Sequence, residues 1–475
     1  MRICFSARDG NNVFTPRLFN ILTANYGQNI EASFITLDEK ETMKVKNTVE
    51  KQVDVFQLNL YIKKYWDEIN IQELAYFEKK YDCAPIWKFI YTDRFLVNYN
   101  YEYTVKTVIA HFRFFENIFE NNKFDFYYDE AIATLHSYVA YIVSKTHGTI
   151  YISQMIARGF DSEYHYFLSG PYQGNKNFRN DYIHIEYPTE IVRKAEEFLD
   201  NFEKKDNKPR YMEITGKRPK LSLKMLKLLA AYIKGYFSKR HNDSYVYLYY
   251  KGYKSILDPI TFYFRYKMSR KYYNEPDYSN KYVYFPLHYQ PEASTLVCSE
   301  KYEKQLYYID SLAKSLPSDT LLYVKEHYAK LGHRELGFYK SLSKYPNVIL
   351  IDPWENSRKL QMNSVAVTTL TGTVGFEAML LRKPVFIGGS IFFENAPGVN
   401  KIEDIFDAYI QFIDNWKAPS RDEIIKFLCE YITSIYEGNA NYVDPLCLED
   451  RNLEKLAISL INQINKEIPK TLYGN

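Results

Sequence analysis

The sequence predicts an α/β protein with two Rossmann-like domains, each built on a parallel sheet and facing the other across a central cleft. Short apolar, β-branched segments alternate with helical patterns over residues 1–200 and again over residues 281–415. Such alternation is typical of parallel sheets covered by helices. The length of 475 residues is enough for two or three domains. Small-residue and polar turns follow several of the strand patterns, where open α/β sheets bind ligands.

The first half of the chain alternates strand and helix patterns. The expected strands are residues 2–6, 32–37, 124–128 and 149–153. The helical patterns between them cover residues 15–26, 105–119 and 131–145. We therefore expect a parallel sheet with helices on its faces.

The second half repeats this alternation more clearly and ends in helices. Its expected strands are residues 282–285, 321–325, 348–351, 364–369 and 384–387, and its last helices are 421–437 and 450–466. We divide the chain into an N-terminal domain (1–203), a basic connecting segment (204–280), a C-terminal domain (281–415) and C-terminal helices (416–475) that pack back across the domains.

Residues 364–381 form the most informative segment, because they are predicted to fold as a strand, a small-residue turn and a short helix. The turn is Thr371-Gly372-Thr373. A helix that begins there presents free N–H groups and a positive dipole end, which suit a phosphate. Gly375 would let a ligand or a neighbouring backbone approach, and Glu377 would reach a ribose hydroxyl. An ordinary turn of an α/β protein remains the alternative.

Two further strand ends carry chemically active side chains. His288, Gln290 and Glu292 follow the strand at 282–285, and Lys325, Glu326 and His327 end the strand at 321–325. Each of these residues alone has an ordinary structural explanation. Because three successive strand ends carry them, we expect one ligand site.

The segments 286–292, 324–327 and 371–378 together resemble the bacterial capsular polysaccharide biosynthesis family, which includes Kdo transferases. The resemblance is strongest over residues 281–400. It implies the GT-B glycosyltransferase fold, with the acceptor bound by the N-terminal domain and a nucleotide sugar bound by the C-terminal domain. The sequence departs from the family pattern at His327-Tyr328, where the usual pair is His-Pro, and at His288, where many members have Gln.

The resemblance also implies the chemistry. The donor would be CMP-Kdo or a related CMP-activated acid sugar, and neither a metal ion nor a cofactor would be needed. The expected catalytic residues are Glu292 and His327, with Asp129 and Glu130 as the alternative carboxylates. The donor would be bound by His288, Gln290, Lys325, Glu326, Thr371, Gly372, Thr373, Gly375 and Glu377.

The charge of the chain is concentrated in one segment. Residues 204–281 hold 19 Lys and Arg against 6 Asp and Glu, a net charge of +13, whereas the whole chain is +3. This concentration predicts an anionic partner. A basic amphipathic helix at 221–239 would suit an anionic membrane surface. A core-facing helix with solvated lysines is the alternative. Nucleic acid is not expected, because no nucleic-acid-binding motif accompanies the charge.

The remaining composition fits a cytoplasmic enzyme, with a peripheral position at the inner face of the cytoplasmic membrane as a further expectation. The five scattered cysteines suggest reduced thiols. No leader-like or membrane-spanning run is apparent.

Two other functions stay open at this point. The same fold would serve a transferase that uses a UDP-sugar, a GDP-sugar or CDP-glycerol, or a UDP-sugar epimerase. Alternatively, the protein would be a non-catalytic scaffold of capsule assembly. Nucleotide selectivity separates the enzymes, and substitutions at Glu292 and His327 separate an enzyme from a scaffold.

Overall fold

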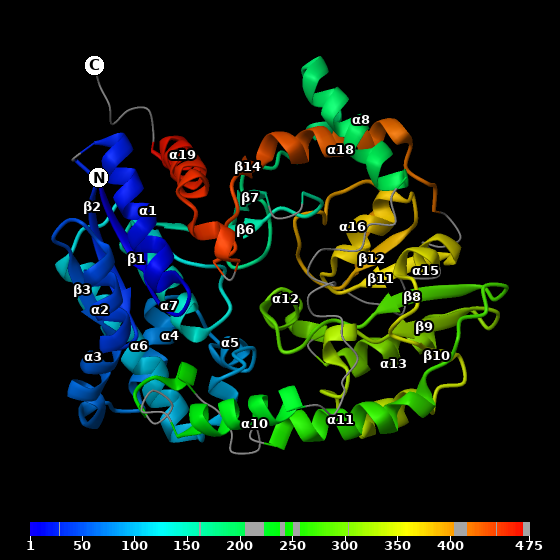
Figure 1. The fold of residues 1–475 in the computed structure, drawn as a ribbon, viewed down its shortest axis with the longest axis horizontal. Coiled ribbons are helices and arrows are strands. Elements are labelled where there is room, and N and C mark those ends of the chain that lie inside the picture. Colours follow the sequence, from blue (N-terminus) through cyan, green and yellow to red (C-terminus); the bar gives the residue numbers. More distant parts are fainter. Residues whose placement is uncertain are drawn as a thin grey trace. The chain divides into compact units, whose positions relative to one another are not determined.

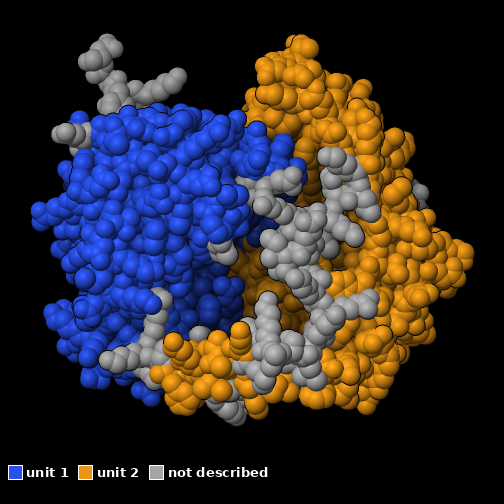
Figure 2. Space-filling view, in the orientation of Figure 1, with its two compact units in different colours: residues 1–177, 243–250, 434–475 blue, residues 178–242, 251–433 orange. Residues whose placement is uncertain are grey.

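The computed structural model divides the chain into two compact units (Figures 1 and 2). It describes residues 1–27, 29–160, 163–204, 223–237, 243–249, 257–302, 304–402, 416–442 and 444–468. Unit 1 contains residues 1–177, 243–250 and 434–475, and unit 2 contains residues 178–242 and 251–433. The division therefore differs from the boundaries expected from sequence, since 178–203 joins unit 2 and 243–250 joins unit 1.

Unit 1 contains a five-stranded parallel sheet in the order β3-β2-β1-β4-β5. Its strands are β1 (Arg2–Ser6), β2 (Glu31–Thr36), β3 (Asp54–Gln57), β4 (Phe126–Tyr128) and β5 (Ile150–Ile152). Every pairing in it is parallel. The strands β1 and β4 are neighbours although six α-helices and two strands separate them in sequence, so the strand order changes direction between them.

Helices cover both faces of this sheet. The helices of unit 1 are α1 (Asn11–Tyr26), α2 (Glu39–Thr48), α3 (Leu58–Tyr65), α4 (Glu73–Lys80), α5 (Trp87–Ile90), α6 (Tyr101–Asn121), α7 (Leu135–Thr146) and α19 (Asp450–Glu467). One buried cluster joins α1 and α19 to the sheet, through residues such as Phe5, Leu18 and Leu456. A second joins α3, α4, α6 and α7 to its other face. The C-terminal helix α19 thus packs on the first helix of the chain.

A smaller antiparallel sheet in unit 1 brings distant parts of the chain together. It has the order β14-β7-β6, with β6 (Gln154–Ile156), β7 (Tyr164–Phe167) and β14 (Tyr436–Glu437). The segment 243–249 is anchored to unit 1 by polar contacts as well. Tyr247 donates a hydrogen bond to Asp93 Oδ2 at 2.8 Å, and Tyr103 donates one to the Ser244 carbonyl at 2.7 Å.

Unit 2 contains a six-stranded parallel sheet in the order β10-β9-β8-β11-β12-β13. Its strands are β8 (Tyr282–Pro286), β9 (Leu321–Lys325), β10 (Val348–Ile351), β11 (Ala366–Thr369), β12 (Val385–Ile387) and β13 (Val399–Lys401). All its pairings are parallel. The predicted α/β architecture with a parallel sheet in each half is confirmed, whereas the cleft between the halves stays a prediction.

The helices of unit 2 include those that follow the strands of its sheet in the chain. They are α8 (Thr189–Lys204), α10 (Leu223–Tyr236), α11 (Asp258–Ser269), α12 (Ala293–Leu296), α13 (Gln305–Ser315), α14 (Leu336–Leu342), α15 (Ser357–Asn363), α16 (Thr373–Leu380) and α18 (Arg421–Ser434), whose last residue belongs to unit 1. A buried cluster packs α13 and α14 on one face of the sheet. On the other face, Tyr282 donates a hydrogen bond to the Leu360 carbonyl of α15 at 2.8 Å.

The helix expected at 221–239 is present as α10, and its outermost predicted residues 221, 222, 238 and 239 lie outside the described residues. In the part of the chain that the structure describes, no helix is long and apolar enough to cross a membrane.

Candidate active site

The site lies where the strand order of the unit 2 sheet changes direction. The strands β8 and β11 are neighbours, while β9 and β10 continue on one side and β12 and β13 on the other. Connections that leave β8 and β11 toward opposite sides open a crevice at the carboxyl ends of these strands, which is the usual ligand position in such sheets. Three predicted strand ends, those of β8, β9 and β11, therefore belong to one edge of one sheet.

His288 joins the end of β8 to the end of β11. Its Nε2 accepts a hydrogen bond from the Leu370 N–H at 3.1 Å and lies 2.9 Å from Thr369 Oγ1. Because Nε2 accepts, the proton of the neutral ring is on Nδ1. Burial, with smaller contributions from His327 and Arg334, lowers the pKa of His288 to about 3. The ring is therefore uncharged at neutral pH and holds the turn before α16.

The turn before α16 is close-packed around Thr369. The Gly372 N–H donates to Thr369 Oγ1 at 3.0 Å. A Cβ at Gly372 would lie 2.6 Å from that oxygen and 3.1 Å from His288 Cε1, so only glycine fits there. The Thr371 hydroxyl donates to the Ser294 carbonyl at 2.6 Å, which ties the turn to α12. This bond uses the hydroxyl proton that we expected a phosphate to receive.

Gly375, in the first turn of α16, is surrounded by side chains. A Cβ at Gly375 would lie 2.9 Å from Thr369 Cγ2 and 3.0 Å from Phe393 Cζ. Gly375 thus allows side chains to pack on the helix, whereas we had expected a ligand or a backbone to approach there. Thr373, the first residue of the helix, is half-buried. Its N–H belongs to the first turn, where intrahelical acceptors are lacking.

Glu377 lies on α16 with its carboxylate turned toward α15. Its Oε2 accepts a hydrogen bond from Gln361 Nε2 at 3.0 Å. Burial raises the pKa of Glu377, while Arg358 and Lys325 lower it. The carboxylate therefore lies within electrostatic range of Lys325, and its contact with a ribose stays a prediction.

The end of β9 carries a buried cation. Lys325 Nζ donates to Ser357 Oγ at 2.7 Å. Burial lowers the pKa of Lys325 to about 8, and Glu355, Asp352 and Glu377 oppose that shift. A lysine in this state is held near its protonation midpoint and gains from a nearby anion.

Glu326 has a structural role that the sequence did not suggest. Its side chain is fully buried and its Oε2 accepts hydrogen bonds from Arg334 Nε and from the Tyr339 hydroxyl, both at 2.9 Å. Its Oε1 accepts from the His327 N–H at 2.7 Å. With both oxygens occupied, Glu326 orients Arg334 and the backbone of His327. Direct donor binding by Glu326 stays a prediction, and it would have to compete with these three hydrogen bonds.

His327 is half-buried and lies among cations. Its Nδ1 accepts from the Ala329 N–H at 3.3 Å, so the proton of the neutral ring is on Nε2. Burial, with smaller contributions from Lys325, Arg334 and Lys330, lowers the pKa of His327 to about 4. His327 is therefore a neutral hydrogen-bond donor at physiological pH.

Tyr328 takes the place of the proline that follows this histidine in the family pattern. Its ring is buried and stacks on His327 with the ring centroids 4.8 Å apart. The His327 side chain also caps the short 3-10 turn Tyr328–Lys330. Stacking and capping restrain the loop where a proline ring would otherwise do so.

Two cations of the site were missed in the sequence. Arg334 donates to the His288 carbonyl at 2.6 Å, and Lys330 Nζ lies 4.0 Å from the centre of the Tyr289 ring. Burial, with a smaller contribution from Arg334, lowers the pKa of Lys330 to about 8. We call Lys325, Lys330 and Arg334 the cationic cluster. The sequence did contain a signal, because Lys330 and Arg334 follow within ten residues of Lys325, the last residue of β9.

Glu292 is exposed and begins α12. It is the N-terminal cap residue of that helix, and the Ser294 hydroxyl donates to its Oε2 at 2.9 Å. Its charge raises the pKa of Lys330, so its carboxylate lies within range of the cationic cluster. Gln290, two residues earlier, is half-buried.

Asp129 and Glu130 belong to unit 1, whereas the other predicted site residues belong to unit 2. Glu130 pairs with Arg8 Nη2 through Oε1 and accepts from the Tyr442 hydroxyl through Oε2 at 2.8 Å. Asp129 is buried, and burial raises its pKa while Arg8 lowers it. Both follow β4 beside the end of β1, the position where the unit 1 sheet changes direction.

The cationic cluster makes a pH dependence predictable. A nucleoside monophosphate loses its second phosphate proton near pH 6, and the two lysines lose theirs near pH 8. Binding needs a doubly charged phosphate and protonated lysines, so affinity for CMP should be highest between about pH 6.5 and 8. Above that range it should fall about tenfold per pH unit for each lysine. Calorimetric titration across pH measures this.

Lys330→Arg is the matched variant for this pH experiment. Arginine stays protonated, so the fall at high pH should become shallower in the variant. An affinity that is flat between pH 7 and 10 in the unaltered protein would contradict the assignment of these lysines to anion binding.

The comparison with family models matches residues 186–407 to the family described as "Capsule polysaccharide biosynthesis protein". The resemblance stated from the sequence is thereby confirmed, and the matched segment contains the whole of the unit 2 site. No curated protein matches the chain in sequence.

Several solved structures match this chain at low sequence identity. Two are from Thermosulfurimonas dismutans KpsC. The β-Kdo 2,7 transferase is 14% identical with a TM-score of 0.36 and covers 75% of this chain and 94% of its own. The β-Kdo 2,4 transferase is 13% identical with a TM-score of 0.35 and covers 67% and 83%. The UDP-GlcNAc 2-epimerase from Neisseria meningitidis is 12% identical with a TM-score of 0.23 and covers 98% and 100%. At these scores the similarities carry no functional argument.

Proposed function

We propose that this protein is a GT-B glycosyltransferase of bacterial surface polysaccharide synthesis that takes an acid sugar, Kdo or a relative, from a CMP-activated donor. The cationic cluster at the direction change of the unit 2 sheet is the observation that carries the proposal. The cluster combines two lysines with lowered pKa and one arginine that bonds the carbonyl of His288, the residue that holds the turn before α16. An activated acid sugar has a phosphate and a carboxylate, and both need such charges.

The leaving group defines what these residues do. When the bond between the anomeric carbon and the phosphate oxygen breaks, the electron pair stays with the phosphate of CMP. Lys325, Lys330 and the N–H groups at the start of α16 stabilise that growing charge. His327, which is neutral, donates a hydrogen bond from Nε2 to the same oxygen or to its neighbour. His288 acts on the donor only through the turn that it holds.

The acceptor hydroxyl forms the new bond and must lose its proton. Glu292 is the first candidate for that proton, because its carboxylate is exposed and belongs to the same unit as the cationic cluster. Asp129 and Glu130 are the alternative, and the ion pair with Arg8 orients the Glu130 side chain. Charge neutralisation is assigned here to side chains and to the α16 terminus, without a metal ion. The described residues contain no group of three or more metal-ligating side chains.

A transfer assay tests this proposal. CMP-Kdo made in situ is mixed with the protein and a fluorescent, Kdo-terminated acceptor, and mass spectrometry follows the acceptor. We expect a mass gain of one Kdo residue, lost in Glu292→Gln if Glu292 is the base. Retained transfer in Glu292→Gln with loss in Glu130→Gln would move the base to unit 1. Transfer from UDP- or GDP-sugars alone would contradict the donor assignment.

The basic segment supplies a second partner, an anionic membrane surface. On α11, Phe264 and Met268 are each 54% exposed beside the exposed Lys267 and Lys271. At the end of α10, Phe237 is 71% exposed and follows the exposed Lys234. The two helices contact each other (Figure 1). Apolar side chains among lysines suit the interface of an anionic bilayer, since burial and charge attraction act together.

Vesicle sedimentation tests this membrane contact. The protein should sediment with vesicles that contain anionic phosphatidylglycerol and remain in solution with neutral phosphatidylcholine vesicles. The double substitution Phe237→Ser and Phe264→Ser should reduce vesicle binding about tenfold or more, because two apolar side chains would no longer insert into the bilayer. Leu60→Ser, which alters an equally exposed apolar residue of α3, is the control. Equal binding by both variants would contradict the contact.

A further inference from the structure

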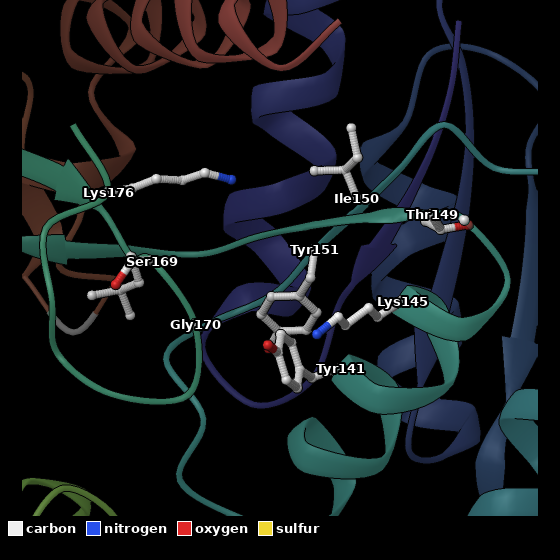
Figure 3. A pocket seen from close by; sticks show the side chains of 10 residues that line it. Tyr141, Lys145, Thr149, Ile150, Tyr151, Ser169, Gly170 and Lys176 are labelled. Carbon is white, nitrogen blue, oxygen red and sulfur yellow. The ribbon is translucent and has the colours of Figure 1, made fainter. Parts of the chain in front are cut away.

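A pocket of about 430 Å³ lies in unit 1, and its lining includes none of the residues assigned above (Figure 3). It lies between the C-terminal end of α7, the edge strand β5 and the loop that follows β7. The side chains and backbone that the argument uses are Tyr141, Lys145, Tyr151, Ser169, Gly170 and Lys176. All of these residues belong to unit 1. A volume of this size accommodates one or two sugar rings.

The loop that forms one wall is held in place by its own hydrogen bonds. Leu168 and Asn175 form an isolated antiparallel bridge, and the Ser169 N–H donates to the Gly174 carbonyl at 3.0 Å. The buried Asn175 donates to Ser434 Oγ at 2.8 Å, and the Lys176 N–H donates to the Phe167 carbonyl at 2.8 Å. The pocket is therefore formed before any ligand arrives, which reduces the entropy cost of binding.

Two tyrosines form an aromatic wall in this pocket. The rings of Tyr141 and Tyr151 meet edge to face, with centroids 5.3 Å apart and an interplanar angle of 88°. The Tyr151 hydroxyl donates to the Glu130 carbonyl at 3.0 Å, which fixes its ring. A tyrosine ring combines an apolar face with a polar tip. A sugar ring has the same combination, with C–H groups on its faces and hydroxyls around its rim.

The charge of the pocket is positive. Its lining includes two lysines and no acidic side chain. Lys176 is neutralised by Glu467, whose Oε1 lies 2.6 Å from its Nζ. Lys145 has no ion pair with the residues that the structure describes, and Figure 3 shows its amine directed toward the two tyrosines. One cation is thus available to a ligand beside the aromatic wall.

We infer that this pocket binds an acidic sugar residue. A ring face packs on Tyr141 and Tyr151, the carboxylate pairs with Lys145, and rim hydroxyls bond the Tyr141 hydroxyl and Ser169. A simple anion would leave the aromatic wall unused, and a neutral sugar would leave Lys145 unpaired. That this sugar belongs to the acceptor glycan is the one part of the inference that rests on the proposed function. The hydrogen bond from Tyr151 to Glu130 connects the pocket to the alternative catalytic carboxylates.

The test uses a matched pair of probes that differ in one group. Methyl glucuronide and methyl glucoside have the same ring, and only the first has a carboxylate. Saturation-transfer NMR should show binding of the glucuronide to the full-length protein about tenfold tighter than that of the glucoside. Lys145→Ala should remove this difference. Gly170→Leu should remove binding of both probes, because its side chain would grow toward the Tyr141 hydroxyl, 3.7 Å from the Gly170 Cβ position.

Controls separate this inference from the proposed function. Lys79→Ala removes an exposed lysine of α4 and should leave both probes unaffected. CMP affinity should be unchanged in Lys145→Ala and Gly170→Leu, so failure of nucleotide binding and failure of this pocket are distinguishable. Equal affinity for both probes, glucuronide binding that survives both variants, or acetate binding as tight as that of the glucuronide would each overturn the inference.

Discussion

Replacing Arg334 with alanine should lower the free energy of unfolding by about 3–5 kcal/mol, because the buried Glu326 carboxylate then lacks its counter-ion. The Glu326 side chain is fully buried and Arg334 is 12% exposed, with 2.9 Å between Arg334 Nε and Glu326 Oε2. The same substitution removes the hydrogen bond to the His288 carbonyl. Urea unfolding of the variant and the unaltered protein measures the change.

An exposed ion pair of unit 2 supplies the matched control. Lys281 Nζ lies 3.1 Å from Asp319 Oδ2, and the two side chains are 42% and 66% exposed. Because water and ions screen such a pair, Lys281→Ala should cost only about 0.2–1 kcal/mol. A loss for Arg334→Ala that is as small as this would show that Glu326 does not depend on Arg334. CMP affinity should fall in Arg334→Ala and stay unchanged in Lys281→Ala.

Replacing His327 with alanine should lower kcat by about 10²–10³-fold, the usual cost of one lost donor to a developing negative charge. His327 also caps the turn at 328–330 through Nδ1, so alanine removes two functions at once. His327→Asn separates them. An asparagine oxygen is able to accept the Ala329 N–H, as Asn does in turns, whereas the Nε2–H donor is lost.

We therefore expect His327→Asn to keep the stability of the unaltered protein and to lose activity as His327→Ala does. Thermal unfolding and the rate of transfer from the donor are measured for both variants. If His327→Asn restored activity, the histidine would act through the turn alone. If neither variant changed the rate, His327 would have no part in the chemistry.

Much of the fold followed from hydrophobic pattern. The strands at 2–6 and 321–325 were placed from apolar, β-branched runs and occur with those bounds as β1 and β9. The pattern missed β3, β6, β7, β13 and β14, which have only two to four residues each. The partner of β14 is also far away in sequence, since Tyr436 pairs with His165. A two-residue strand has no period of its own, so nothing local indicates it.

The candidate site was predictable in position and less so in the role of each residue. The strand-end rule placed His288, Lys325, His327 and Thr371 correctly at one sheet edge, because the carboxyl ends of parallel strands share an edge. It did not reveal that the Thr371 hydroxyl already bonds Ser294. Such bonds depend on the approach of α12, which only the folded chain defines.

Lys330 and Arg334 were missed for a related physical reason. In sequence they look like solvated charges of a surface loop, and only their burial and their contacts with Tyr289 and His288 show otherwise. Glu326 was placed in the donor site because it stands between Lys325 and His327. The folded chain instead turns it inward, to Arg334 and Tyr339.

The central claim is that the sheet edge of unit 2 binds the nucleotide of a CMP-activated sugar. Calorimetric titration with CMP, CDP, UDP and GDP, without and with Mg²⁺, tests it most directly. The account predicts that CMP binds selectively, without a need for Mg²⁺, and that His327→Ala and Lys330→Ala each weaken that binding. Tighter binding of UDP or GDP would contradict the donor assignment. No binding of any of the four nucleotides would contradict the transferase itself.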